Sequence, residues 1–477
     1  MRSLLLIRHS LRHSTMASPK LYALFVFLFS LFSRHSASDD SSSCFLGMNY
    51  GRIADNLPSP SKVVELLKSQ GIRRVKLYDT DSEVLAALSG SGITTTVALP
   101  NDQLSSAAAA DRTFTDSWVR SNVVPYKSII EAVAVGNEVF VDPANTTSYL
   151  VPAMRNVYAS LARYGVASSV KVSSPIALSA LATSYPPSSG SFKPGLVDPV
   201  MKPMLGFLKQ TGSYLMVNAY PFFAYEANAD TISLDYALFR DNQGVVDPSN
   251  GIVYKSLLDA QLDAVYSAAS AAGFGDVKLV VSETGWPSKG DEGETGASAA
   301  NAQAYNGNLV RRVLTCRGTP LRPDMPLSVY LFALFNEDQK PGPTSERNYG
   351  LFYPNEDKVY SIPLGLESGP VNNGSKVQVV PPAAAGQTWC VARADVGRER
   401  LQAALDYACG EGGADCTEIQ PEAACYYPNT IDAHASYAFN SYYQKNSRAS
   451  GTCHFDGAAY VVTQTPKFGS CEYPTGN

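Results

Sequence analysis

The chain has 477 residues, of which 45% are hydrophobic and 17% charged, so it can bury at least one large core. Glycine and proline occur at close to average frequency, which excludes a low-complexity or disordered body. The formal net charge is −5. Because every charge in residues 1–38 is basic, the remainder carries 33 basic against 43 acidic residues. Such a surface repels phosphate, so no nucleic-acid partner is expected.

The N-terminal segment is expected to be a targeting signal. Basic residues precede an unbroken apolar run over 21–32, and small residues follow at 36–38. This pattern is typical of a secretory signal peptide, here 1–38 with cleavage near Ser38. A transit peptide and a membrane anchor are the alternatives. The unbroken apolar run disfavours the first, and its 12 residues are too few for the second.

Between about residue 44 and residue 364, strand-like and helix-like segments alternate. Several strand candidates are near-continuous apolar or β-branched runs, as expected of parallel strands buried on both faces. Amphipathic helix candidates lie between them, among them 61–70, 81–90, 149–165 and 301–314. The strand candidates are 45–50, 71–79, 92–99, 129–137, 170–176, 214–222, 277–284 and 327–336. Eight strand–helix repeats predict an α/β fold, a (β/α)8 TIM barrel. The lack of a glycine-rich phosphate-binding motif disfavours an open doubly wound sheet.

Two isolated cysteines flank the predicted barrel. Cys44 precedes the first strand, and Cys316 ends the helix before the eighth. Both then lie at the N-terminal face, where the barrel closes. The sequence leaves two possibilities for these cysteines, a Cys44–Cys316 disulfide or a pair of free buried thiols.

The remainder of the chain changes character. Residues 365–387 are polar, contain Gly, Pro and Ala, and lack a period, which predicts a linker. Six cysteines follow within 388–477, which predicts a second, small disulfide-rich domain; without a Cys-x2-Cys pair, zinc is disfavoured. Asn145 and Asn373 begin N-glycosylation sequons, compatible with exposed loops of an exported protein.

Histidine is absent between residues 39 and 389. Nucleophile systems that depend on histidine are therefore excluded from the predicted barrel, as are histidine metal sites. Carboxylate, lysine and tyrosine side chains remain for proton transfer and covalent attack. No metal or cofactor is expected.

Acidic residues occupy the C-terminal ends of four predicted strands: Asp79, Glu138, Glu283 and Glu337. In a TIM barrel this end carries the active site. A single acid there can be a helix N-cap or an ion-pair partner, which is expected of Asp79. A pair of carboxylates with different pKa values, however, is the usual apparatus for cleaving a glycosidic bond. Aromatic residues that can stack on sugars, or pack in the core, accompany them: Tyr50, Tyr78, Tyr220, Phe222, Phe223 and Trp286.

Seven motifs, in order and at barrel spacing, resemble those of plant family 17 glucan endo-1,3-β-glucosidases, which are glycoside hydrolases. They are GMNYGR (47–52), VKLYDTD (75–81), AVGNE (134–138), VNAYPFF (217–223), VSETGWPS (281–288), FNEDQKPGP (335–343) and ERNYGLF (346–352). The resemblance implies that 39–364 is a catalytic domain that hydrolyses β-1,3-glucan with retention. We also expect the protein to be a monomer and, once exported, to act in the cell wall.

The resemblance also implies roles for individual residues. Glu138 would be the general acid/base and Glu283 the nucleophile, and retention requires their carboxyl groups to be about 5–5.5 Å apart. Lys340, a lysine among these carboxylates, would help to keep Glu283 ionised while Glu138 stays protonated. Supporting or substrate-binding positions would be Tyr50, Asn137, Tyr220, Trp286, Glu337, Lys340 and Glu346. For Glu337, Lys340 and Glu346 a purely structural or solvated role stays open.

Residues 388–477 resemble the X8, or family 43 carbohydrate-binding, module. The resemblance implies binding of β-1,3-glucan and the disulfides Cys390–Cys453, Cys409–Cys416 and Cys425–Cys471. Phe439, Tyr442 and Tyr443 are candidates for the binding surface, with core packing as the alternative for each. The sequence has no apolar stretch after Glu472, so no lipid anchor is expected.

Three functions are compatible with these patterns. The first is an endo-β-1,3-glucanase that its tail holds on the polymer. The second is a glucan-binding wall protein with an idle barrel, which the presence of both Glu138 and Glu283 disfavours. The third is an enzyme for mixed 1,3;1,4-β-glucan, because loop shape alone can change the linkage.

Overall fold

A computed structural model of the chain describes residues 44–364, 388–393, 396–421, 423–427, 429–449, 452–462, 466 and 471–475. The expected signal peptide, the expected linker and Asn373 lie outside these ranges. The chain forms two compact units, 1–369 and 370–477, each described by itself below.

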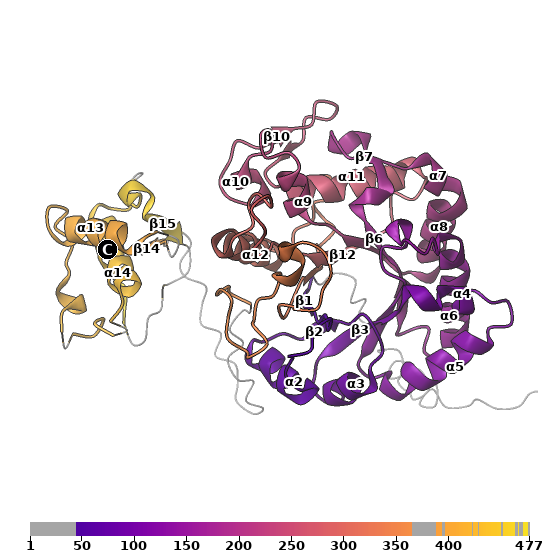
Figure 1. Ribbon diagram of the computed structural model, residues 1–477. Coiled ribbons are helices and arrows are strands. Elements are labelled where there is room, and N and C mark those ends of the chain that lie inside the picture. The colour runs from indigo at the N-terminus through magenta and orange to yellow at the C-terminus, as the bar shows by residue number, and fades with distance from the viewer. Residues whose placement is uncertain are drawn as a thin grey trace, which may run out of the picture. The chain divides into compact units, whose positions relative to one another are not determined.

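The first unit is a barrel of parallel strands with helices around it (Figure 1). Its strand order is β5-β4-β3-β2-β1-β13-β12-β9-β6. The two strands that end this order, β5 (Lys171–Ser173) and β6 (Pro175–Ala177), are separated only by Ser174. They are therefore halves of one interrupted strand, and the ring of eight closes through them. The predicted (β/α)8 architecture is confirmed.

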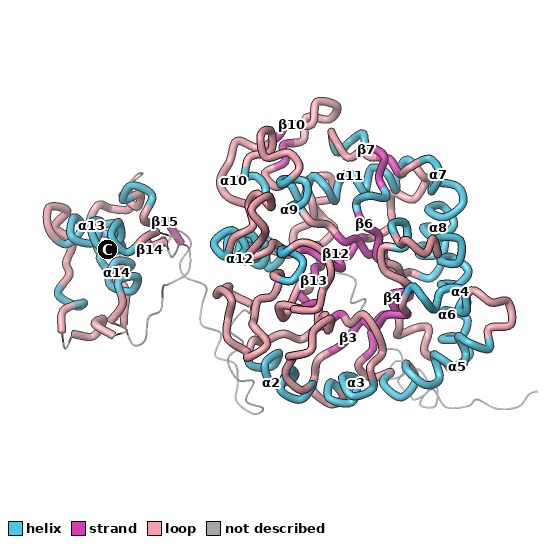
Figure 2. Tube along the Cα trace, viewed as in Figure 1, coloured by secondary structure: helices cyan, strands magenta, loops and turns pink. Residues whose placement is uncertain are grey.

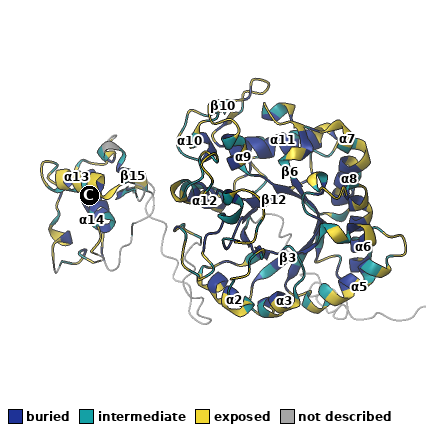
Figure 3. Cartoon of the chain, viewed as in Figure 1, coloured by how far each residue is buried: buried dark blue, intermediate teal, exposed yellow. Residues whose placement is uncertain are grey.

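Each predicted strand overlaps an observed one. The other barrel strands are β1 (Leu46–Asn49), β2 (Arg74–Lys76), β3 (Thr94–Leu99), β4 (Ile130–Val135), β9 (Leu215–Asn218), β12 (Leu279–Thr284) and β13 (Val329–Leu331). Their residues are almost all buried, since side chains fill the barrel on one face and the helices cover the other (Figure 3).

Amphipathic helices pack around the strands (Figure 2). They begin where the sequence supplies caps: Asp81, Ser256 and Ser298 each accept a hydrogen bond from the first turn of the helix that follows. The helices of this unit are α2 (Pro60–Ser69), α3 (Ser82–Leu88), α4 (Leu104–Ala107), α5 (Thr113–Asn122), α6 (Leu150–Arg163), α7 (Pro194–Leu196), α8 (Lys202–Thr211), α9 (Pro221–Glu226), α10 (Leu234–Ala237), α11 (Leu257–Ala271) and α12 (Ala299–Leu314). None of the helices within the described ranges is long and apolar enough to span a bilayer.

Two small hairpins lie in the connections between barrel elements, one after β6 and one between α10 and α11. The first pairs β7 (Leu181–Thr183) with β8 (Ser191–Phe192), and the second pairs β10 (Val245–Val246) with β11 (Val253–Tyr254). Ser188 joins them, because its backbone N–H and its hydroxyl both donate to the carboxylate of Asp247 at 2.8 Å.

The barrel is tied at its N-terminal face by a disulfide. Cys44 and Cys316 are bonded, with their Cα atoms 5.3 Å apart, so they are not free thiols. The bond joins the segment before β1 to the segment after α12, next to the pairing of β1 with β13. It therefore connects the first and the last elements of the barrel.

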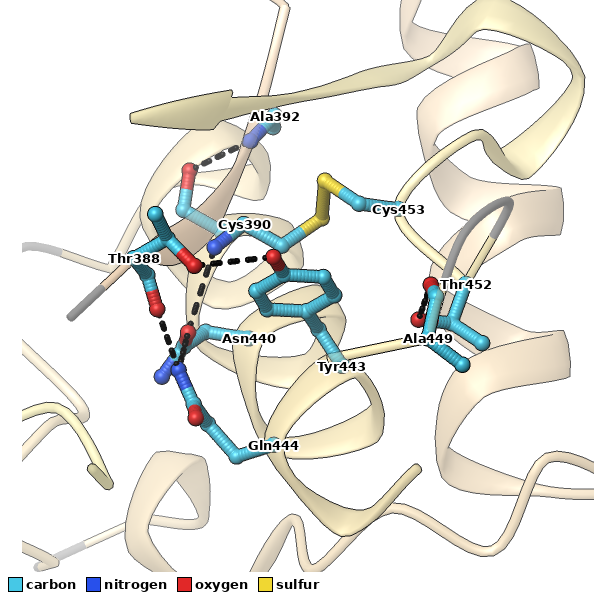
Figure 4. Close-up of a disulfide and its surroundings, with 10 residues drawn as sticks. Thr388, Cys390, Ala392, Asn440, Tyr443, Gln444, Ala449, Thr452 and Cys453 are labelled. Atoms are coloured by element: carbon cyan, nitrogen blue, oxygen red, sulfur yellow. Dashed lines mark hydrogen bonds between the residues drawn. A yellow bond between two sulfur atoms is a disulfide. The ribbon is translucent and has the colours of Figure 1, made fainter. Parts of the chain in front are cut away.

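The second unit is a small α/β module. An antiparallel pair, β14 (Trp389–Ala392) and β15 (Ala459–Val462), packs with α13 (Arg398–Cys409) and α14 (Ile431–Lys445). Three disulfides, Cys390–Cys453, Cys409–Cys416 and Cys425–Cys471, join its segments. Figure 4 shows the first of them beside Tyr443, whose hydroxyl is hydrogen-bonded to that of Thr388 at 2.9 Å.

Candidate active site

A cavity of about 890 Å³ lies at the C-terminal ends of the barrel strands. Its size suits an extended ligand of several rings. Seven of the nine site residues expected from the sequence line it: Asn137, Glu138, Tyr220, Glu283, Glu337, Lys340 and Glu346.

Trp286 and Tyr50, the other two residues expected to contact a sugar, do not line this cavity. Trp286 is fully buried; its indole packs against Phe222 and Tyr305, and its N–H donates to the carbonyl of Gly296 at 2.9 Å. Tyr50 is only 4% exposed, and its ring packs edge-on against Phe335. Both aromatics belong to the buried core of the barrel, where burial of their large apolar faces is favourable.

Glu283, on β12, is held from two sides. The Lys76 ammonium from β2 donates to its Oε1 at 2.9 Å, and the Tyr220 hydroxyl donates to its Oε2 at 2.9 Å. The side chains of Lys76 and Glu283 are 1% and 7% exposed. Burial by itself raises the pKa of Glu283, but the charge of Lys76 and the hydrogen bonds from Lys76 and Tyr220 outweigh it, so the pKa is lowered. The carboxylate is therefore ionised at neutral pH.

Lys76, which the sequence analysis did not single out, makes the contact with Glu283 that was expected of Lys340. It lies in the barrel interior, with its ammonium 3.9 Å from the centre of the Tyr78 ring. A signal for it existed: Arg74, Lys76 and Tyr78 alternate along a short strand, which puts all three on one face. In a barrel that face is the interior.

Glu138 follows β4 and has the left-handed backbone conformation, with φ of 50°. Its N–H donates to the carbonyl of Pro175 at 3.0 Å, which fixes this uncommon geometry. The side-chain amide of Asn218 donates to its Oε1 at 2.8 Å. Burial raises the pKa of Glu138, and the nearby negative charge of Glu283 raises it further. The surroundings of the two carboxyl groups thus shift their pKa values in opposite directions.

Asn218, at the end of β9, connects the two glutamates and was not predicted from the sequence. Besides Glu138, its amide N–H reaches Oδ1 of Asn137 at 3.3 Å. Its own Oδ1 accepts from the hydroxyl of Ser282, which precedes Glu283, at 2.7 Å. Asn218 is therefore hydrogen-bonded both to Glu138 and to the residue that precedes Glu283.

Asn137 is braced by a further asparagine. The side chain of Asn101 accepts from the backbone N–H of Asn137 at 2.8 Å and donates to its carbonyl at 2.9 Å. These two hydrogen bonds to the backbone fix the peptide that leads into Glu138. The residue was missed because amides after strands are common in loops and carry no pattern of their own.

Glu337 and the pair Lys340–Glu346 also line the cavity. Glu337 accepts from the N–H of Ile53 at 2.8 Å, and burial raises its pKa. Its carboxylate lies so close to Gly51 that a Cβ there would collide with it. Lys340 donates to Glu346 at 3.1 Å and lies 4.4 Å from the centre of the Phe332 ring. Lys340 is thus paired with Glu346 rather than with the carboxylate of Glu283.

Asp79 is a barrel-mouth ion-pair residue, as expected. Its carboxylate accepts from the guanidinium of Arg52 at 2.5 Å, and Arg52 also pairs with Asp81 at 3.1 Å. Asp81, rather than Asp79, caps α3. Both Arg52 and Asp79 line the mouth of the cavity.

The chain is similar to known proteins over both units. Residues 46–364 match the model of glycosyl hydrolases family 17, and residues 388–460 match the X8 domain. Glucan endo-1,3-beta-glucosidase 12 of Arabidopsis thaliana is 41% identical over 451 residues, covering 90% of this chain and 84% of that protein. The glucan endo-1,3-beta-D-glucosidase of Olea europaea is 40% identical over 463 residues, covering 96% and 98%.

A solved structure agrees with this. CJP38, a beta-1,3-glucanase and allergen of Cryptomeria japonica pollen, matches with 39% identity and a TM-score of 0.64, covering 67% of this chain and 99% of its own. The family match extends over most of the chain and includes the whole cavity. The chain belongs to glycosyl hydrolases family 17 and is a glycoside hydrolase with an X8 domain.

Proposed function

We propose that this chain is a secreted, retaining endo-hydrolase of β-1,3-glucan, with Glu283 as nucleophile and Glu138 as general acid/base. The observation that carries the proposal is the opposed effect of the environment on these two carboxyl groups in one cavity. The pKa of Glu283 is lowered and that of Glu138 is raised. We infer the substrate, β-1,3-glucan, from the names of its relatives, which are glucan endo-1,3-β-glucosidases at 40–41% identity.

The first step breaks the glycosidic bond. Protonated Glu138 gives its proton to the glycosidic oxygen, and ionised Glu283 attacks the anomeric carbon, which forms a glycosyl ester as the sugar alcohol leaves. Lys76 and Tyr220 hold the attacking carboxylate in place while it is still charged, with hydrogen bonds to different oxygens. The charge of Lys76 and the hydrogen bonds from Lys76 and Tyr220 also lower the pKa of the nucleophile.

The second step releases the sugar. Formation of the ester removes the negative charge of Glu283, one of the causes that raise the pKa of Glu138. The carboxylate of Glu138 can then take a proton from water as the water oxygen attacks the anomeric carbon. Glu283 leaves as a carboxylate and Glu138 is again protonated. Two displacements at one carbon retain its configuration.

Export and polymer binding complete the proposal. The signal peptide expected at 1–38 would direct the chain to an oxidising compartment, and four disulfides within the described ranges suit that compartment. The X8 unit would hold the enzyme on its glucan and raise the local substrate concentration. Asn145 is exposed and remains a predicted glycosylation site.

Hydrolysis of laminarin, followed by NMR of the first product, tests this function. The β anomer should appear before mutarotation, with oligosaccharides of several lengths from internal cleavage. Glu283→Gln should abolish hydrolysis in a protein that is still folded by circular dichroism, at a lower melting temperature because the buried ammonium of Lys76 loses its counter-ion. An α anomer as first product would contradict the retaining mechanism. Faster cleavage of lichenan than of laminarin would favour the mixed-linkage alternative, and unchanged activity of Glu283→Gln would remove the assigned nucleophile.

A further inference from the structure

The N-terminal face of the barrel, opposite the catalytic cavity, carries a surplus of basic side chains. The parallel strands run from this face, and the helices between them return to it. The connections that lead from a helix into the next strand contain Asp276 and Asp324 as their acidic residues. Their basic residues, together with those at the first positions of β2 and β5, are Arg73, Arg74, Lys127, Lys171, Lys278, Arg317 and Arg322.

The last turns of α2, α5, α6, α8 and α12 add further basic residues to this face. They are Lys68, Arg120, Arg163, Lys209, Arg311 and Arg312. A positive charge at a helix C-terminus is favoured by the helix dipole, so these residues have a local cause. Arg73, Lys127 and Arg317 lie outside the helices and are exposed. No ion pair within residues 44–364 involves any of these three, so their charge is not neutralised by the barrel.

Basic residues that are distant in sequence lie on adjacent segments of this face. The strand that Lys171 begins is hydrogen-bonded to the segment 213–215, and this segment is hydrogen-bonded to the carbonyl of Lys278 at 2.8 Å. The guanidinium of Arg322 donates to the carbonyl of Gly275, in the same connection as Lys278, at 3.0 Å. Backbone contacts therefore hold three basic side chains near one another.

The disulfide of the barrel brings a second group together. Arg317 follows the cysteine that is bonded to Cys44. Phe45, the next residue, has the guanidinium of Arg74 at 4.4 Å from the centre of its ring. Arg73 is the neighbour of Arg74 in the chain. The basic residues therefore extend around the face rather than occupying a single loop.

The opposite face, at the C-terminal ends of the strands, has the reverse charge. Its cavity is lined by the carboxyl groups of Asp79, Glu138, Glu283, Glu337 and Glu346, against the cations of Arg52 and Lys340. The helix α6, with 14 residues, is about 21 Å long. This length exceeds the Debye length, which is about 8 Å at physiological ionic strength. The basic face can therefore attract an anion although the net charge of the chain is −5.

We propose that the N-terminal face of the barrel binds an anionic polysaccharide, a polymer that carries carboxylates on successive sugar rings. Guanidinium groups bind carboxylates through two parallel hydrogen bonds, and ammonium groups bind them as point charges. Each exposed contact is weak, so attachment needs several contacts along one polymer chain. Binding at this face leaves the cavity at the other end of the barrel free for the neutral glucan.

Two other classes of polyanion fit the face less well. Single-stranded nucleic acid is held by stacking of its bases on aromatic rings, and membranes are held by apolar side chains that insert between lipids. Within residues 44–364, the exposed large hydrophobic side chain at this face is Leu314, at 37%, and no aromatic ring accompanies it. A carboxylated polysaccharide requires charge alone.

Chromatography of the full-length protein on immobilised polygalacturonate, in a salt gradient, tests this binding. The protein should be retained at low ionic strength and released as the salt concentration rises. It should not be retained on the same polymer with its carboxyl groups methyl-esterified. The triple variant Arg73→Glu/Lys127→Glu/Arg317→Glu should bind polygalacturonate about tenfold more weakly or worse at low ionic strength. Its hydrolysis of laminarin should be unchanged, which also shows that the barrel is folded.

The matched control is Lys62→Glu/Arg155→Glu/Lys358→Glu, which changes the net charge equally at exposed residues outside this face. It should stay within about twofold of the parent. Equal losses in both triple variants would overturn the proposal, because overall charge would then explain the retention. Unchanged retention of the first variant, or retention on the esterified polymer, would also overturn it. Tighter binding to RNA or to phosphatidylserine vesicles than to polygalacturonate, at the same ionic strength, would overturn the choice of a polysaccharide.

Discussion

The ammonium of Lys76 lies 2.9 Å from Oε1 of Glu283, and neither side chain is more than 7% exposed. A buried ion pair of this kind is a weak source of stability, because desolvation opposes the attraction. Its effect on chemistry is larger. It lowers the pKa of the nucleophile of the proposed mechanism within the same cavity in which burial raises the pKa of Glu138.

Lys76→Met should move the acid limb of the pH profile of kcat/KM to higher pH. Activity requires ionised Glu283, and without the ammonium its pKa is expected to rise, because the charge of Lys76 and its hydrogen bond lower that pKa. The loss of rate should therefore be greater at pH 5 than at pH 7. The pH profile on laminarin measures this shift. An unmoved acid limb would mean that Lys76 does not act through Glu283.

The matched control for this change is Lys209→Met. Lys209 is 53% exposed and pairs with Asp276 on the surface at 2.8 Å. Removing it should leave both limbs of the profile in place, since an exposed pair is screened by water.

Asn218→Ala should move the alkaline limb instead. The amide of Asn218 donates to Glu138, and this hydrogen bond lowers the pKa that burial and Glu283 raise. Its loss should raise the pKa of the acid, so the alkaline limb moves to higher pH while kcat falls as the carboxyl loses its orientation. Asn228→Ala, which removes an exposed asparagine bonded to a backbone carbonyl, is the control. A shift of the alkaline limb to lower pH would contradict this account.

Asp263 should make the barrel more stable as the pH falls towards 4. It is buried on α11 and accepts from the N–H of Leu321 at 2.8 Å, and burial raises its pKa to about 6. The unfolded value is about 3.9, so the folded state binds the extra proton between roughly pH 4 and pH 6. The stabilising contribution of Asp263 is therefore present below this window and is lost as the pH rises through about 6. Asp263→Asn should reduce the change in the free energy of unfolding between about pH 4 and pH 6 by about 2–3 kcal/mol. Urea unfolding at several pH values measures this change. Asp198→Asn, at a side chain that is 81% exposed, should not reduce it.

The Cys44–Cys316 disulfide should stabilise the barrel but not change its chemistry. It closes a loop with a sequence separation of 272 residues, for which chain-entropy arguments give about 2–5 kcal/mol. The Cys44→Ser/Cys316→Ser variant should unfold at lower temperature and keep the pH limbs of the parent. Equal melting temperatures of the two proteins would show that the bond contributes nothing to the stability of the barrel.

The fold could be predicted from the sequence because its signals are local and repeated. Apolar runs such as 129–137 and 277–284 mark buried parallel strands, and eight of them leave few architectures to choose from. The interruption at Ser174 could not be predicted. It depends on which neighbour each half of the strand pairs with, β4 on one side and β9 on the other.

The site was predicted in part, for a similar reason. Glu138 and Glu283 stand at strand ends within motifs, so the barrel topology alone brings them to one cavity. Lys76 and Asn218 were missed because their importance arises from contacts across the barrel, 207 and 80 residues away in sequence. The burial of Trp286 could not be predicted, because a motif does not tell which side of a strand end a side chain takes.

Trapping of the covalent intermediate tests the central claim most directly. Incubation with a 2-deoxy-2-fluoro laminaribiosyl fluoride should stop turnover and add one fluorinated disaccharide to the protein. Digestion and tandem mass spectrometry should place this mass on Glu283, and Glu283→Gln should not be labelled. Label on any other residue, or complete turnover of the reagent without labelling, would contradict the assignment of Glu283 as the nucleophile.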